Sequence, residues 1–197
     1  MFRVNTNIIS DILLAVFSVA GFIIIPRWLA HHMGYAIAPL VIDKKAAGTL
    51  RNYVWNVLSG KAGLAQASDL DVVFYDVNVS YAETLWLQQD LQQRYPAYQW
   101  EIKNQVYMHS HSPNTLPYQN ARDAVSKYPE RCTAIATRLN NDELELFLPY
   151  GDDDIVNFVV QSTPHFLEDK KRMQVYRERL AKKDWQEKWP NLQLFDK

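Results

Sequence analysis

The sequence contains a single cysteine, no excess of either charge, and no internal repeat or low-complexity segment. Cys132 has no partner for a disulfide within the chain, which fits a reducing compartment. Lys and Arg total 21 against 22 for Asp and Glu, whereas a surface dedicated to nucleic acid carries a clear basic excess. The balance speaks against a protein that mainly coats nucleic acid, and leaves room only for a local basic patch.

The pattern also lacks a full-length membrane span. The apolar run from Ile12 to Ile25 is interrupted only by Ser18 and Gly21, and it is shorter than the roughly 20 residues that cross a bilayer. Arg3 is the only early cation and no convincing cleavage site follows, so a signal peptide is not indicated. We expect a buried helix here and a cytoplasmic protein with no membrane partner; a membrane tether is the alternative.

What is present predicts one α+β (mixed α/β) domain, because helical and strand patterns alternate along a chain that is 48% hydrophobic. A core of about residues 46–160 is expected between N-terminal helices (1–45) and a helical C-terminal segment (161–197). Ser80 and Glu83 form a capping-box pattern, and Asn140 marks a hairpin turn. The expected helices cover 11–25, 27–33, 48–58, 80–95, 120–128, 152–160 and 165–188, and the expected strands 70–75, 98–106, 133–139 and 143–148.

Two aspartates stand at the entrance of the strand 70–75. Side chains alternate along a strand, so Asp69 and Asp71 point the same way, about 7 Å apart. Two neighbouring carboxylates repel and each costs free energy when desolvated, so a cation is expected between them. Oxygen ligands with room for water suit Mg²⁺ or Mn²⁺. The alternative is that both acids lie in a solvated loop before the strand.

A third acid, Glu101, lies on the strand 98–106. Trp100 and Ile102 face one side of that strand, while Glu101 and Lys103 face the other. Glu101 is therefore a candidate third metal ligand, and Lys103 a candidate for stabilising charge on a substrate. An edge strand with an ordinary polar face, carrying a plain Glu101–Lys103 pair, explains the same pattern.

A helix start at Gly48 supplies a candidate phosphate site. The free N–H groups and dipole of a helix N-terminus attract phosphate. Gly48 permits close approach of the backbone, Thr49 offers a hydroxyl, and Arg51 adds positive charge. A single glycine before a helix is a weak signal by itself.

Taken in order, these motifs resemble the DNA polymerase beta-like nucleotidyltransferase superfamily, and more closely a bacterial family of uncharacterised nucleotidyltransferases. The similarity covers about residues 46 to 192. Thr49 stands where Ser or Gly is usual, the spacing from Thr49 to Asp69 is longer than usual, and Asp43-Lys44-Lys45 replaces an expected apolar strand. The segments that carry the resemblance are Ala47–Trp55, Asp69–Asp76, Trp100–His109, Ala134–Leu139, Pro149–Gly151 and Arg179–Pro190.

The resemblance implies transfer of a nucleoside monophosphate from an NTP, such as ATP, to an acceptor that the sequence does not identify, with release of pyrophosphate. It implies that Asp69, Asp71 and Glu101 are both catalytic residues and ligands of Mg²⁺ or Mn²⁺. The nucleotide-binding residues that it implies are Gly48, Thr49, Arg51, Asn52 and Lys103. A non-catalytic nucleotide-binding or interaction module with the same fold is the alternative.

Other charged or histidine-rich segments have simpler explanations. His109 and His111 lack the further ligands that a zinc site needs. Asp152-Asp153-Asp154 is typical of a helix N-terminus. The basic residues between 170 and 183 alternate with acids, which favours a solvated face over an RNA contact. Nucleic acid is therefore a less favoured partner.

Overall fold

The computed structural model describes residues 41–42, 45–63, 69–96, 99–140 and 143–196. Both helices expected before residue 40 lie outside these ranges. The main sheet has the strand order β3-β2-β1-β4-β5. β2 and β3 run parallel, whereas the β1–β2, β1–β4 and β4–β5 pairs are antiparallel. The strands are β1 (Val41–Ile42), β2 (Asp69–Phe74), β3 (Gln99–Asn104), β4 (Ala136–Asn140) and β5 (Glu143–Phe147).

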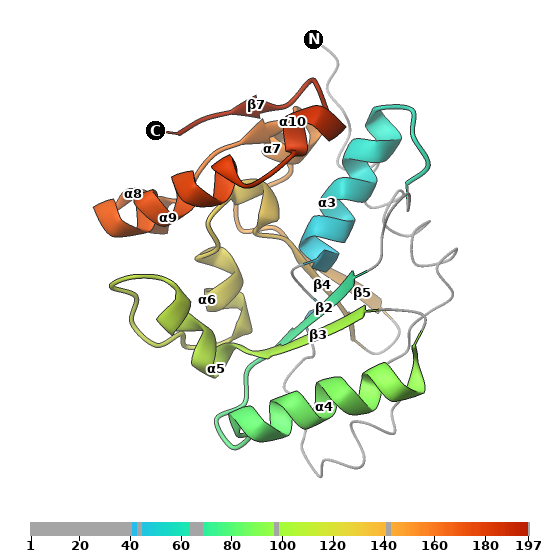
Figure 1. Cartoon of the computed structure of the whole chain (residues 1–197), viewed down its shortest axis with the longest axis vertical. Helices are drawn as coiled ribbons and strands as arrows, with labels where there is room; N and C mark the ends of the chain where they lie inside the picture. The colour runs from blue at the N-terminus through green and yellow to red at the C-terminus, as the bar shows by residue number, and fades with distance from the viewer. Residues whose placement is uncertain (1–40, 43–44, 64–68, 97–98, 141–142, 197) are drawn as a thin grey trace.

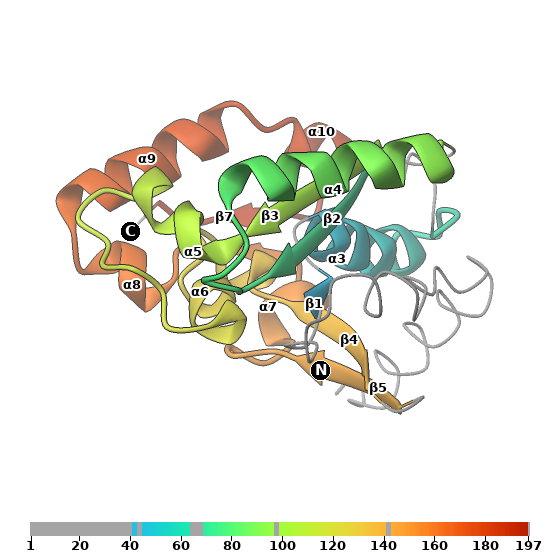
Figure 2. The same ribbon diagram turned by 90° about the horizontal axis from the view of Figure 1, so that it is seen from below.

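Helices cover the sheet from both sides (Figure 1). α4 (Tyr81–Arg94) connects β2 to β3 and lies along both strands, while α3 (Lys45–Leu58) and the C-terminal helices lie on the opposite side (Figures 1 and 2). A second sheet pairs β6 (Val159–Val160) with β7 (Gln193–Leu194) in parallel. The remaining helices are α5 (Gln105–Met108), η1 (His109–His111), α6 (Ala121–Ser126), η2 (Arg131–Thr133), α7 (Asp153–Val156), α8 (Pro164–Leu167), α9 (Lys170–Ala181) and α10 (Trp185–Lys188). Helices and strands mix as predicted, and the α+β class is confirmed.

α4 forms where the capping pattern predicts it. Ser80 is the N-cap, its hydroxyl accepts a hydrogen bond from the backbone N–H of Glu83, and the Glu83 carboxylate accepts one from the Ser80 N–H. The inner face of the helix, represented by Leu87 and Leu91, packs against apolar side chains from β2 and β3. This contact uses one face of the two strands and leaves the other face available for polar residues.

Tryptophans close the core on the opposite side of the sheet. Trp55 of α3 is fully buried and stacks edge-on against Trp185 and Trp189, with ring centroids 6.1 and 5.1 Å away. Its indole N–H donates to the Ile155 carbonyl at 2.8 Å, and that of Trp189 donates to Asn56 Oδ1 at 3.0 Å. Trp185 and Trp189 are therefore core residues.

Several predicted boundaries are wrong. The expected helix 165–188 consists of α8, α9 and α10, because Asp169 caps α9 by accepting from the N–H groups of Lys171 and Arg172. The helix expected over 152–160 ends at Val156, since Phe158 adopts a left-handed φ of 56° and leads the chain into β6. The strand 98–106 ends at Asn104, where α5 begins. None of the helices among the described residues has the length and apolar character needed to cross a bilayer.

Candidate active site

The face of β2 and β3 that points away from α4 carries the polar residues. The two strands are in parallel register, and Asp71 pairs with Glu101. Their neighbours Val72 and Ile102 pack toward α4, so alternation turns both acids to the other side. Asp71 and Glu101, separated by 30 positions in the sequence, therefore lie side by side on one face of the sheet.

Lys103 joins the two acids. Its Nζ lies 2.5 Å from Glu101 Oε2 and 3.8 Å from Asp71 Oδ1. The Asp71 side chain is only 1% exposed, whereas those of Glu101 and Lys103 are 42% and 29% exposed. The cluster thus runs from a buried carboxylate to a carboxylate and an ammonium at the surface, where a substrate can reach them.

Asp69 extends the row of acids at the level of the backbone. It is the first residue of β2 and pairs with Gln99; its side chain lies outside the described part of the structure. Among the side chains that are described, no group of three or more His, Cys, Asp or Glu residues could hold a metal ion. The described part of the site is therefore the acidic pair with its lysine.

Asn104 ties the ends of the two strands together, and sequence reasoning did not single it out. Its side chain is buried at the end of β3, where Nδ2 donates to the carbonyls of Asp76 (2.7 Å) and Val79 (3.1 Å). Its Oδ1 accepts from the Asp76 N–H at 3.2 Å. Because these bonds hold the segment after β2 against β3, Asn104 helps keep the two acids in register. The signal in the sequence was that Asn104, a polar residue, falls on the same face of the strand as the apolar Trp100 and Ile102.

The start of α3 differs from the prediction. The helix begins at Lys45, three residues before Gly48, because the alanines at 46 and 47 favour helix. The free N–H groups of the first turn then belong to residues up to Ala47, ahead of Gly48. Gly48 and Thr49 lie inside the helix, and the Thr49 side chain is outside the described part of the chain.

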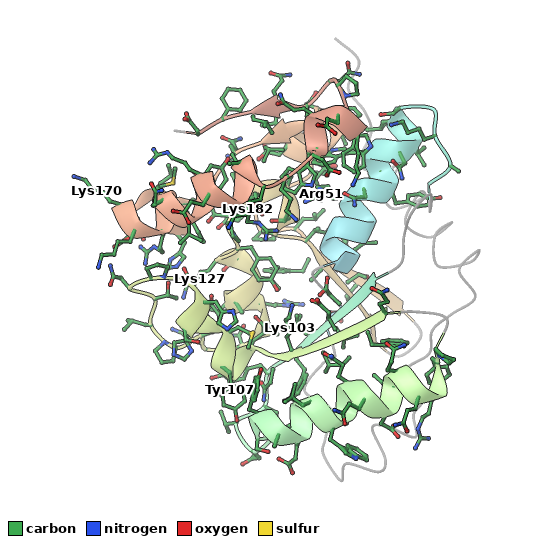
Figure 3. All side chains as sticks on the ribbon, in the orientation of Figure 1. Arg51, Lys103, Tyr107, Lys127, Lys170 and Lys182 are labelled. Carbon is green, nitrogen blue, oxygen red and sulfur yellow. The ribbon has the colours of Figure 1, made fainter. Side chains whose placement is uncertain are left out.

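Arg51 lies in the core and not at an open helix start. Its guanidinium carbon lies 4.6 Å from the ring centroid of Trp55 and 4.4 Å from that of Trp185, and the residue is 3% exposed. It donates to Asn52 Oδ1 at 2.8 Å. Burial lowers the pKa of Arg51. Figure 3 shows Arg51 close to the C-terminal helices and Lys103 at β3, where Lys103 contacts the acids. The structure therefore does not bring Arg51 to the acidic pair.

The other candidate segments have structural contacts. His109 Nδ1 lies 3.1 Å from the Val106 carbonyl, and the ring packs edge-on against Tyr118. Asp154, the only buried acid of its cluster, accepts from Gln161 at 2.9 Å and pairs with Arg131 at 3.1 Å. These contacts stabilise loops and helix ends near the core.

α9 and the residues after it form the most basic stretch of the chain. Residues 170–183 contain seven Lys or Arg and one acid, Glu178, a net charge of +6 in a chain of net charge −1. Glu168 pairs with Arg172 at 3.8 Å, whereas two other acids that flank the stretch have different partners. Asp169 caps α9, and Asp184 pairs with Lys188 at 2.9 Å. Lys170, Lys171 and Lys182 are exposed and form no ion pair with the described residues.

Comparisons with known proteins show the family and the fold of this chain. One solved structure is 51% identical to this chain, with a TM-score of 0.75. It is described as an NMR structure that reveals a CCA-adding enzyme head domain. The match covers 82% of this chain and 84% of the other. No curated protein matches. The sequence pattern of a nucleotidyltransferase family matches residues 44–194, and the protein belongs to that family.

Proposed function

We propose that the protein transfers a nucleoside monophosphate from an NTP, such as ATP, to an acceptor hydroxyl, with Mg²⁺ or Mn²⁺ held by Asp69, Asp71 and Glu101. The observation that carries the proposal is the pairing of Asp71 with Glu101 on one face of adjacent strands, with the Lys103 ammonium against both. The family match supports nucleotidyl transfer in general. The metal and the substrates are our inference.

The donor set fits a hard divalent cation. Asp71 and Glu101 offer carboxylate oxygens from neighbouring strands, the ligand type that Mg²⁺ and Mn²⁺ prefer. A buried carboxylate such as Asp71 is costly without a positive charge nearby, and Lys103 shows that a cation is accommodated there. A bound divalent ion supplies positive charge that stabilises the attacking and leaving oxygens of a phosphoryl displacement.

The residues of the chain then have distinct tasks. The acceptor oxygen forms a bond to the α-phosphorus, the bond between that phosphorus and the bridging oxygen to the β-phosphate breaks, and pyrophosphate leaves. Glu101, whose side chain is 42% exposed, would accept the proton of the acceptor hydroxyl. Lys103 offers a positive charge for the phosphate oxygens. Asp71 is buried, so its carboxylate is held in one position in the site.

The proposed nucleotide contacts are Gly48, Thr49, Asn52 and Lys103. Arg51 is left out, because its buried guanidinium packs against two tryptophan rings. Its effect on the nucleotide site is through the packing of α3.

The basic surface of α9 favours an acceptor that carries phosphate groups. Lys170 and Lys171 begin α9, a helix of 12 residues about 18 Å long, and Lys182 directly follows its last residue. That length spans several phosphates of an extended strand. Replacing all three by glutamate is expected to weaken salt-dependent binding of single-stranded RNA. Unchanged binding, or no binding by the wild type at low salt, would remove the phosphate-bearing acceptor and leave the transfer reaction standing.

The reaction is tested by nucleotide binding and turnover. Wild-type protein is expected to bind an NTP in a Mg²⁺-dependent way, and the double variant Asp69→Asn with Asp71→Asn to lose that dependence. Equal binding by both proteins would refute the metal assignment. Release of pyrophosphate with any acceptor separates an enzyme from a non-catalytic nucleotide-binding module, for which binding persists without turnover.

A further inference from the structure

Lys103 brings a positive charge to both members of the acidic pair in this structure. Its Nζ reaches Glu101 Oε2 on its own strand and Asp71 Oδ1 on the next. These carboxylates come from register partners. They are also the groups that a divalent ion would bind, so the ammonium and the ion compete for the same oxygens.

We propose that Lys103 is an exchangeable counter-ion, which occupies the acidic pair in the metal-free protein and turns to the nucleotide phosphates when the metal and nucleotide bind. This inference rests on the function proposed above and describes how its site is loaded. The acidic pair with its ammonium carries a net charge of −1, and Asp69 adds a further negative charge, so a divalent ion is attracted to these carboxylates. An ion placed beside the retained ammonium would repel it, so the ammonium must leave.

The position of Lys103 allows this exchange. Its side chain is 29% exposed, and its flexible stem can carry the ammonium away from the acids without movement of β3. The buried partner Asp71 cannot move in the same way, because it is almost entirely enclosed. Lysine is therefore the mobile member of the cluster.

Coupling between ligands follows from the exchange. A metal ion alone must break the contacts of Lys103 and leave the ammonium without a partner, so it binds weakly. A nucleotide gives the released ammonium a phosphate partner, so each ligand strengthens the binding of the other by the same factor. The site then favours metal and nucleotide together over metal alone.

The test is Mn²⁺ binding, measured by electron paramagnetic resonance, with and without a non-hydrolysable NTP analogue. Lys103→Met is expected to bind Mn²⁺ alone at least about tenfold more tightly than wild type, and to gain much less from the analogue. Lys103→Arg keeps the positive charge and is expected to bind as weakly as wild type. Lys127→Met is the matched control, because Lys127 is 28% exposed and pairs with Asp123 at 2.8 Å.

The outcomes separate this inference from the metal site itself. If Lys103→Met binds Mn²⁺ no more tightly than wild type while Asp71→Asn abolishes binding, the metal site stands and the exchange is refuted. If neither wild type nor Lys103→Met binds Mn²⁺, both proposals fail.

A second measurement uses wild-type protein and does not depend on the folding of a variant. Peptide mass spectrometry reports the rate at which an amine-reactive reagent modifies each lysine side chain. Saturating Mn²⁺ is expected to raise the rate at Lys103, and the analogue to lower it again, with Lys127 unaffected. A Lys103 rate that does not respond to bound Mn²⁺ contradicts the exchange.

Discussion

Replacement of Asp71 by asparagine separates the metal contribution of this residue from its structural one. The change keeps the shape of a side chain that is 1% exposed and removes its charge. The attraction to Lys103 that is lost is about 4 kcal/mol at an effective dielectric constant of about 20. Repulsion from Glu101 and several kcal/mol of desolvation are removed with it. Lys103 keeps Glu101 as a partner at 2.5 Å, so the ammonium is not left unpaired. We expect the free energy of unfolding of the metal-free variant to lie within about 1 kcal/mol of the wild-type value.

With metal the two proteins should diverge. At a metal concentration about 100 times its dissociation constant, binding stabilises the folded state by about 2.7 kcal/mol. In a chain of this size that raises the melting temperature by about 5–10 °C. Calorimetry in EDTA and in Mg²⁺ or Mn²⁺ is expected to show this rise for wild type and little or none for Asp71→Asn.

A second buried aspartate supplies the control. Asp154 is also buried and pairs with Arg131 at 3.1 Å, but it lies on α7, away from β2 and β3. Asp154→Asn is expected to lower the melting temperature in EDTA and to keep the full rise with metal. The reasoning is refuted if Asp71→Asn retains the metal-induced rise of the wild type.

Further predictions concern the core and its titratable groups. Burial raises the pKa of Cys132 to about 12, so a thiol reagent at pH 8 is expected to label it only at the rate of unfolding; rapid labelling of native protein would contradict its enclosure. Trp185→Ala is expected to cost about 3–5 kcal/mol in urea denaturation, and exposed Trp86→Ala less than about 0.5 kcal/mol; similar losses would exclude the tryptophan core. Burial is the main cause that lowers the pKa of His165, and the nearby cations Arg172 and Lys127 lower it further. The unfolded state then binds more protons, so stability is expected to fall as the pH drops below about 6.5, and His165→Gln should weaken that dependence; an unchanged slope would remove His165 as its cause.

Local sequence was sufficient where neighbours along the chain decide the structure. Ser80 and Glu83 are three positions apart, so the start of α4 depends on contacts within one turn. Alternation along β3 likewise places Glu101 and Lys103 on one face before any partner strand is considered. The hairpin β4–β5 follows from an equally local pattern, the turn residues at Asn140.

Longer contacts decided what local patterns left open. The local sequence predicts that Arg51 is a cation at a helix start. Trp185, far away in the sequence, packs against Arg51 and helps to bury it. The acids within the C-terminal charged segment read as a solvated face, yet Asp169 caps α9 and divides the helix. The partner of Arg51 lies far away in the sequence. The cap at Asp169 depends on the path that the backbone takes before α9.

The sequence by itself identified the candidate acids and determined which face of each strand they occupy, since side-chain alternation is a property of any strand. Only the tertiary structure decided that Asp71 lies opposite Glu101 and that Lys103 reaches both, because these contacts need β2 and β3 to be parallel and in one register. That register depends on the packing of α4 and on the hydrogen bonds of Asn104, which join residues almost 30 positions apart.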